Sequence, residues 1–227
     1  MEKSEIKGFI AKRVAQELKD GDVVNLGIGI PTQCARYFPE GVDITLHAEL
    51  GLIGQGPAPT PEQADPLHVV DASGNPATII PGGAIVDSAT NFGLIRGGHV
   101  DACVLGALEA DAEGSFGNWL IPGKKLTGMG GAMDLVNGSK TVILAMIHTQ
   151  GDKPKIVEKC TLPLTGYKVV DMIVTELCVL KVTPEGLELA EYNPELGNRD
   201  TAVRIIQEKT AAKLHISPDL KPMRLPD

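Results

Sequence analysis

The sequence predicts an α/β fold, with an open mixed sheet flanked by helices. Near the start, a short apolar run, a glycine loop and a helix-forming segment follow one another over residues 23–32, which is the usual opening of a βαβ unit. Apolar runs of strand length recur along the chain, and segments with helical periodicity stand near both ends. With 227 residues, of which 43% are hydrophobic, the chain suits one core, so we expect a single domain over residues 1–227.

Each element follows from its local pattern. Apolar residues at helical spacing predict a first helix that ends at Gly21, and Val23–Leu26 then reads as a buried strand. A second helix is expected from Thr32, and the run 42–46 is the next strand. Further strands are expected at 100–105, 141–145, 169–174, 178–182 and 187–192, and a closing helix at 201–209. The stretch 51–91 shows little periodicity, and only 78–81 and 84–86 suggest pieces of a small antiparallel sheet.

Composition excludes several classes of function. The formal charge of -8, without a cluster of Lys and Arg, argues against a nucleic-acid-binding protein. The N-terminus is too polar for a signal peptide, and the longest apolar run, Val142 to Ile147, is too short to cross a bilayer. The four cysteines lack disulfide or zinc spacing, and the five histidines lack ligand spacing, so we expect reduced thiols, no metal and a cytoplasmic protein.

Glu49 is the strongest candidate for chemistry. It is a lone acid at the end of the run 42–46, and three glycines follow within seven residues. An acid in loose backbone at the end of a strand suits a nucleophile or a general base, although a solvated loop acid fits the composition equally well. A second glycine cluster at 128–131 offers backbone amides for the opposite wall of the same pocket.

Two other glycine motifs are weaker. Gly27-Ile28-Gly29 lacks the third glycine of a dinucleotide-binding fingerprint, because position 32 is threonine, so a turn on a pocket floor is the better interpretation. Arg96-Gly97-Gly98-His99 suggests an anion site, but the motif precedes a strand instead of opening a helix, which favours a structural turn.

Five stretches carry a resemblance that covers nearly the whole chain. They are residues 24–32, 94–101, 118–124, 128–136 and 159–165, which read VNLGIGIPT, LIRGGHVD, NWLIPGK, GMGGAMDLV and KCTLPLT. In this order they resemble the β subunit of two-subunit class I CoA-transferases, the family of 3-oxoacid, acetoacetate and butyrate-acetoacetate CoA-transferases. The resemblance implies the CoA-transferase-like fold, which is related to that of sugar-phosphate isomerases.

The resemblance also implies roles for individual residues. The family's nucleophilic glutamate lies in a Ser-Glu-Asn-Gly motif, and the matching positions here read Ala48-Glu49-Leu50-Gly51. The glutamate is retained, and the loss of the flanking Ser and Asn bears on substrate range more than on reaction type. The backbone oxyanion donor falls on Gly131, with Gly130 beside it. Further contacts to substrate or CoA are expected at Leu50, Gly51, Arg96 and Gly128.

The implied reaction moves CoA between an acyl-CoA and a short-chain carboxylic or 3-oxo acid, as in the metabolism of short-chain fatty acids and ketone bodies. It proceeds by ping-pong kinetics through a glutamyl-CoA thioester on Glu49 and needs no cofactor other than CoA, which is itself a substrate. The implied partner is an α subunit in an α2β2 heterotetramer, which supplies a second oxyanion donor.

Other functions remain open at this point. A sugar-phosphate isomerase of the same broad fold would use Glu49 as a base and Arg96 in a phosphate site. An acyl-CoA hydrolase would keep the nucleophile and pass the acyl group to water. A catalytically silent subunit would stabilise a partner, with the changes at Ala48 and Leu50 marking lost chemistry.

Overall fold

The computed structural model describes residues 3–65, 67–72, 74–124, 126 and 128–224, with backbone only at 3 and 4. The helices are α1 (Lys3–Ala15), α2 (Ser88–Arg96), α3 (Ala132–Gly138) and α4 (Arg199–Lys209), with short 3-10 helices η1 (Pro31–Arg36) and η2 (Pro194–Leu196). The strands of the main sheet are β1 (Val23–Leu26), β2 (Thr45–Ala48), β3 (Leu52–Gln55), β4 (Ile79–Ile85), β5 (Ala102–Leu105), β8 (Thr141–Ala145), β12 (Met172–Val174), β13 (Cys178–Thr183), β14 (Gly186–Tyr192) and β15 (Leu214–Pro222).

These ten strands form one mixed sheet in the order β15-β14-β13-β12-β8-β5-β1-β2-β3-β4. The five central strands, from β12 to β2, are mutually parallel, while β3, β4, β13 and β14 each pair antiparallel with their inner neighbours. Smaller sheets join β6 (Glu109–Asp111), β7 (Phe116–Gly117) and β11 (Ile156–Val157), and pair β9 (Thr149–Gln150) with β10 (Lys153–Pro154). The predicted open mixed α/β sheet is confirmed.

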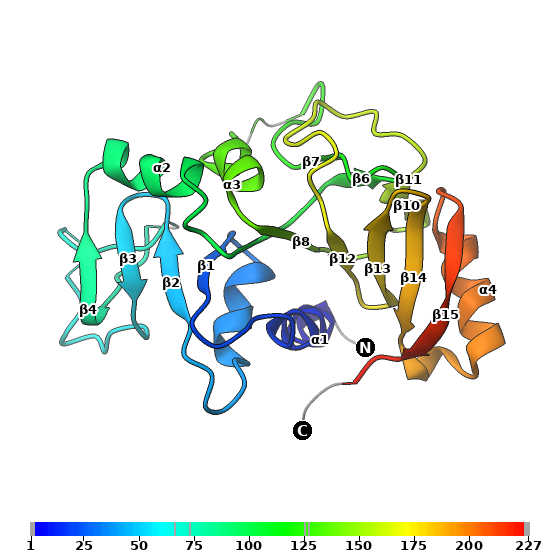
Figure 1. The fold of residues 1–227 in the computed structure, drawn as a ribbon, viewed down its shortest axis with the longest axis horizontal. Coiled ribbons are helices and arrows are strands. Elements are labelled where there is room, and N and C mark those ends of the chain that lie inside the picture. The colour runs from blue at the N-terminus through cyan, green and yellow to red at the C-terminus, as the bar shows by residue number, and fades with distance from the viewer. Residues whose placement is uncertain (1–2, 66, 73, 125, 127, 225–227) are drawn as a thin grey trace.

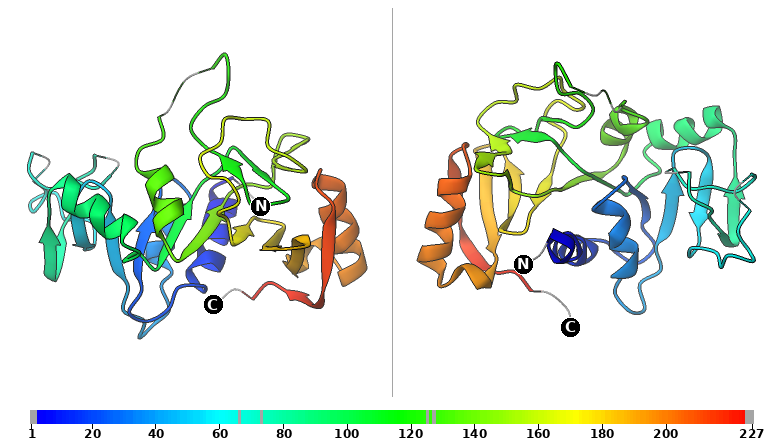
Figure 2. Two further views of the ribbon diagram at one scale, coloured as in Figure 1. Left: turned by 45° about the horizontal axis from the view of Figure 1, so that its top comes forward. Right: turned by 180° about the vertical axis from the view of Figure 1, so that it is seen from behind.

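Helices cover both faces of the central strands. Cys103 and Leu105 of β5 pack in one core cluster with Ile95 of α2 and Leu135 of α3, whereas Val104 packs in a second cluster with α1. This alternation follows from the period of two in a strand, which turns successive side chains to opposite faces. Figure 1 shows α1 and α3 on opposite sides of β8. Figure 2 shows, from behind, α4 at the β15 end of the sheet and β4 at the other.

Several predicted elements have the expected bounds, and others differ for local reasons. The strands Val23–Leu26 and Thr141–Ala145 match their predictions. The first helix ends at Ala15, well before Gly21, although Leu18 is still buried beyond its end. The helix expected from Thr32 is the 3-10 helix η1, and the strand expected at 42–46 is shifted to Thr45–Ala48.

The stretch 51–91 contains β3, β4 and the start of α2. The two pieces expected in a small antiparallel sheet form a single strand, β4, which pairs antiparallel with β3 in the main sheet. The antiparallel pairing is confirmed, and the prediction of a small sheet was wrong. The positive φ of Gly82 (87°) carries the strand past Pro81, where other residues would be strained. Helix α2 was not predicted, because its short sequence contains Thr, Asn and Gly, but the Asp87 side chain caps it by accepting from the Thr90 amide.

Candidate active site

Glu49 begins a tight turn at the carboxyl end of a central strand. It directly follows Ala48, the last residue of β2, and β3 returns antiparallel from Leu52, which pairs with Ala48. The turn closes through a hydrogen bond from the Gly51 amide to the Ala48 carbonyl (3.0 Å). The backbone after the strand is therefore tighter than the loose loop that the glycines suggested, and it holds Glu49 in a defined position.

Gly51 is required by the geometry of this turn. Its φ is 117°, and a Cβ at this position would clash with the carbonyl oxygen of Val86. The Gly51 carbonyl accepts from the Val86 amide at 2.9 Å, which ties the turn to the segment before α2. Gly51 thus holds the turn that carries Glu49, and this structural role is separate from the substrate contact expected there.

The second glycine cluster lies against the Glu49 side chain. A Cβ on Gly131 would lie 3.0 Å from Glu49 Cγ and 3.3 Å from Phe92 Cζ, and a Cβ on Gly130 would lie 3.8 Å from Glu49 Oε1. Gly131 is the N-cap of α3. Within the described part of the chain, no acceptor takes the Gly131 amide hydrogen. The fold therefore brings together the carboxylate and the backbone donors that the sequence placed in one pocket.

An asparagine on the neighbouring strand contacts the carboxylate. Asn25 of β1 lies opposite His47 in the parallel register and is 1% exposed. Its Nδ2 lies 3.3 Å from Glu49 Oε2, 3.0 Å from the His47 carbonyl and 3.2 Å from His47 Nδ1. The Glu49 oxygen and the His47 carbonyl can only accept, so the amide nitrogen must face them. Asn25 Oδ1 is buried without a described partner.

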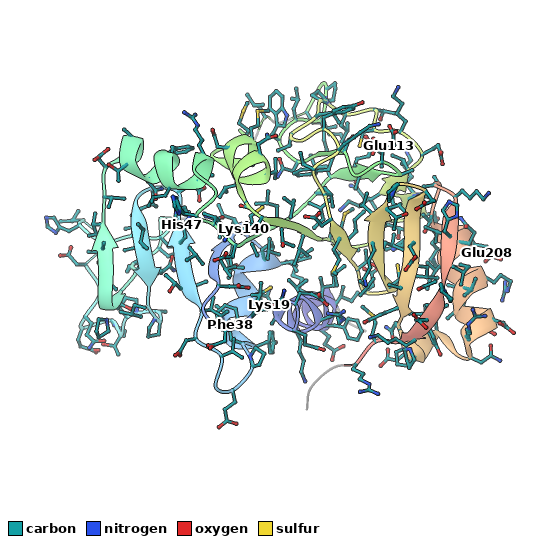
Figure 3. All side chains as sticks on the ribbon, in the orientation of Figure 1. Lys19, Phe38, His47, Glu113, Lys140 and Glu208 are labelled. Atoms are coloured by element: carbon teal, nitrogen blue, oxygen red, sulfur yellow. The ribbon has the colours of Figure 1, made fainter. Side chains whose placement is uncertain are left out.

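His47 and Asn91 extend this network to α2. His47 Nε2 lies 2.8 Å from Asn91 Oδ1, and Asn91 Nδ2 donates to the Glu49 carbonyl at 2.6 Å. Figure 3 labels His47 on β2, beneath α2. Since Asn91 presents its oxygen and Asn25 its nitrogen, the His47 ring carries its proton on Nε2 and accepts at Nδ1. Burial lowers the pKa of His47, although Asn91 and the Glu49 charge oppose the shift, so the ring is neutral at pH 7.

Glu49 lies between two cavities. The larger cavity has a volume of about 570 Å³, and its walls include Asn25, Gly106, Asn118, Gly128 and Gly130. The smaller cavity has a volume of about 280 Å³, and its walls include Leu46, Ala48, Gln33 and Arg36. Both include Glu49 in their walls. One carboxylate therefore faces two separate spaces, which suits a group that exchanges one bound molecule for another.

The remaining predicted residues have different positions. Gly128 lines the larger cavity, as a substrate contact requires. Leu50 is 43% exposed and is absent from the described walls of both cavities. Arg96 forms an ion pair with Asp134 (Nε to Oδ1, 2.7 Å) beside a separate cavity of about 230 Å³. The isomerase hypothesis requires Arg96 to lie near Glu49. In the structure, Arg96 is not among the residues that line the two cavities around Glu49.

Asn25, His47 and Asn91, which connect to Glu49 through hydrogen bonds, are not among the residues predicted for the site. One local signal existed for Asn25, because it is a lone polar residue inside the apolar run Val23–Leu26. Within the described residues, no group of three or more His, Cys, Asp or Glu is placed to hold a metal ion. No helix in this part of the chain is long and apolar enough to cross a membrane.

Comparisons with known proteins agree with this geometry. The coenzyme A transferase family profile matches residues 9–196. The acetate CoA-transferase subunit beta of Escherichia coli K12 is 49% identical over 219 residues, covering 96% of this chain and 97% of that protein. The rat mitochondrial succinyl-CoA:3-ketoacid coenzyme A transferase 2A is 42% identical over 218 residues, and the match covers 95% of this chain but only 41% of that longer protein.

Solved structures show the same fold. The thioester complex with CoA of the acyl-CoA transferase YdiF from Escherichia coli O157:H7 superposes with a TM-score of 0.70 and 25% identity, over 96% of this chain and 43% of that one. This chain therefore spans less than half of YdiF. Because a family profile and a relative at 49% identity both cover most of the sequence, the chain belongs to the coenzyme A transferase family, where its relatives include β subunits.

Proposed function

We propose that this chain is the catalytic β subunit of an enzyme that moves CoA between an acyl-CoA and a short-chain carboxylic or 3-oxo acid. The observation that carries the proposal is the position of Glu49, which is partly buried between two cavities with Gly130 and Gly131 against its side chain. A carboxylate in this position attacks a carbonyl carbon without a separate base.

The reaction proceeds through exchanges at one carboxylate. A Glu49 oxygen attacks the thioester carbonyl of the acyl-CoA, and the C–S bond breaks to give an acyl-glutamyl anhydride and CoA thiolate. The thiolate then attacks the glutamyl carbonyl and releases the first acid, leaving a glutamyl-CoA thioester. A second carboxylate attacks this thioester to form a new anhydride, and the returning thiolate attacks its acyl carbon, which gives the new acyl-CoA and free Glu49. Every step exchanges one acyl bond for another, so no external energy source is needed.

Each tetrahedral intermediate requires hydrogen-bond donors for its oxyanion. The Gly131 amide, which has no acceptor among the described residues and lies beside Glu49, is the backbone donor. Removal of such a donor from comparable sites raises the barrier by about 3 to 4 kcal/mol. Asn25 holds one oxygen of Glu49 through its Nδ2, so that the other oxygen, Oε1, is directed towards the glycine cluster. Buried, neutral His47 fixes Asn25 without adding a charge beside the nucleophile.

We further propose an α subunit as the partner, in an α2β2 assembly. Supporting this, the Escherichia coli relative is named a subunit beta, and apolar side chains are exposed beside the site. They include Ile28 (66% exposed), which lines both cavities, and Met129 (38% exposed), which lines the larger one.

The four cysteines are free thiols, which supports the reducing cytoplasm as the compartment.

Intact-protein mass spectrometry of the assembled enzyme tests the proposal. The chain, co-expressed with its α subunit, is incubated with a panel of short acyl-CoAs. We expect a mass gain equal to CoA minus water, absent in Glu49→Gln and retained in Glu40→Gln, a matched change at an exposed glutamate. No adduct with any donor in a correctly assembled complex would refute a catalytic Glu49. Discharge of the adduct to water but not to any acid would instead identify a hydrolase.

A further inference from the structure

The two cavities around Glu49 are neighbours that share wall residues. The larger and smaller cavities share Leu26, Ile28 and Glu49. At its other end, the smaller cavity shares Thr32, Gln33 and Arg36 with an open cleft between α1 and η1. The smaller cavity therefore has one end at the nucleophile and a second end at Arg36.

Arg36 offers an unpaired cation at that second end. It lies in the last turn of η1, is exposed, and forms no ion pair or side-chain hydrogen bond with any residue that the structure describes. It is the only cationic side chain among the described residues that line the smaller cavity. A guanidinium in this state presents a planar set of donors that matches a carboxylate in a bidentate arrangement.

No other described side chain in the wall of the smaller cavity offers a positive charge to a carboxylate. Asp71 also lines the cavity, but its carboxylate accepts from Asn75, at 2.9 Å from the backbone amide and at 3.3 Å from Nδ2. His47 is held neutral by burial. Gln33 and Gln55 are uncharged. The apolar part of the cavity wall includes Leu26, Leu46 and Ala48.

We infer that the smaller cavity binds the acid that exchanges CoA, and that Arg36 binds a second carboxylate at the distal end of that acid. The enzyme then prefers short dicarboxylic acids over monocarboxylic acids of the same length, with the methylene chain against Leu46 and Ala48. The inference rests on the proposed function, because it requires the first carboxylate of the acid to react at Glu49.

The sizes of the cavities support this division. Ligand cavities for drug-sized molecules typically measure about 300 to 1,000 Å³. The larger cavity, at about 570 Å³, suits the long pantetheine arm of CoA, whereas the smaller, at about 280 Å³, suits a short acid. The phosphates of CoA are separated from its sulfur by the whole pantetheine arm. Arg36, on the wall of the smaller cavity, is therefore assigned to the acid and not to a CoA phosphate.

A comparison of two acids of equal chain length as acceptors tests the inference. Initial rates with succinate and butyrate as acceptors, and acetyl-CoA as donor, give the ratio of kcat/KM for the diacid to that for the monoacid. We expect the intact enzyme to favour succinate, and Arg36→Gln to lower the ratio by about 10- to 100-fold, the range for a lost hydrogen-bonded charge pair. Arg36→Lys restores part of the preference, and Arg204→Gln, a change at an exposed arginine on α4, leaves the ratio unchanged.

The possible failures are distinguishable. An unchanged ratio in Arg36→Gln, or no preference for succinate in the intact enzyme, overturns the inference while the glutamyl-CoA adduct still supports the proposed function. A higher KM for acetyl-CoA, with an equal loss for both acids, assigns Arg36 to a phosphate of CoA and also overturns it. Absence of the adduct in the intact enzyme refutes the proposed function itself.

Discussion

Replacement of Asn25 by alanine tests whether the buried amide positions the nucleophile. The change removes the donor that lies 3.3 Å from Glu49 Oε2 and 3.0 Å from the His47 carbonyl. An unsatisfied buried acceptor costs about 1 to 3 kcal/mol. The Asn25 oxygen already lacks a described partner, so its removal offsets part of that cost. We therefore expect a loss of about 2 kcal/mol in stability, at the middle of this range.

The effect on the reaction is expected to exceed the effect on stability. A reacting group misplaced by about 1 Å loses on the order of 100-fold in rate, and Glu49 loses its side-chain tether in this variant. We expect kcat to fall by about 10- to 100-fold, and a loss of about 2 kcal/mol to lower Tm by about 4 to 8 °C in a chain of this size.

The assay compares initial CoA-transfer rates and thermal unfolding of the assembled enzyme. Asn137→Ala is the matched control, because among the described residues that exposed side chain donates only to the Met133 carbonyl within α3. Asn25→Asp adds a pH readout. The introduced carboxylate faces two acceptors, so activity should recover as the pH falls and the new group gains a proton. A folded Asn25→Ala enzyme with the original kcat would show that Asn25 does not position Glu49.

Two further changes have defined outcomes. Gly131→Ala keeps an allowed backbone (φ -84°) but places a Cβ 3.0 Å from Glu49 Cγ, so kcat should fall about 10-fold with Tm nearly unchanged. Gly93→Ala, which meets nothing within 4 Å, should be neutral. A Gly131→Ala enzyme with the original kcat would contradict the contact. Burial, with Lys209 and Lys155 nearby, lowers the pKa of His148 from 6.5 to about 4. As the pH falls, His148 gains its proton in the unfolded chain at a higher pH than in the folded chain. The free energy of unfolding should therefore fall by about 3 kcal/mol between pH 6.5 and 4. Denaturant titrations should show a flatter pH dependence in His148→Gln, and identical curves would exclude His148 as the cause.

Local patterns were sufficient for much of the fold. The apolar runs at Val23–Leu26 and Thr141–Ala145 identify β1 and β8, because a buried parallel strand must be apolar on both faces. The same patterns failed where tertiary contacts define an element. The pieces of β4 carry no clear alternation, since five of its seven residues are exposed at the end of the sheet, and only pairing with β3 makes them one strand.

By itself, the sequence determined that Glu49 follows a strand and that a glycine cluster stands downstream, since both are local properties of the chain. Only the tertiary structure decided that the two meet, and that Asn25, His47 and Asn91 connect them. His47 and Asn91 are 44 positions apart, and Asn25 meets His47 only because β1 and β2 are parallel neighbours in that register. Strand order and register arise from packing between distant segments, so no local pattern contains them.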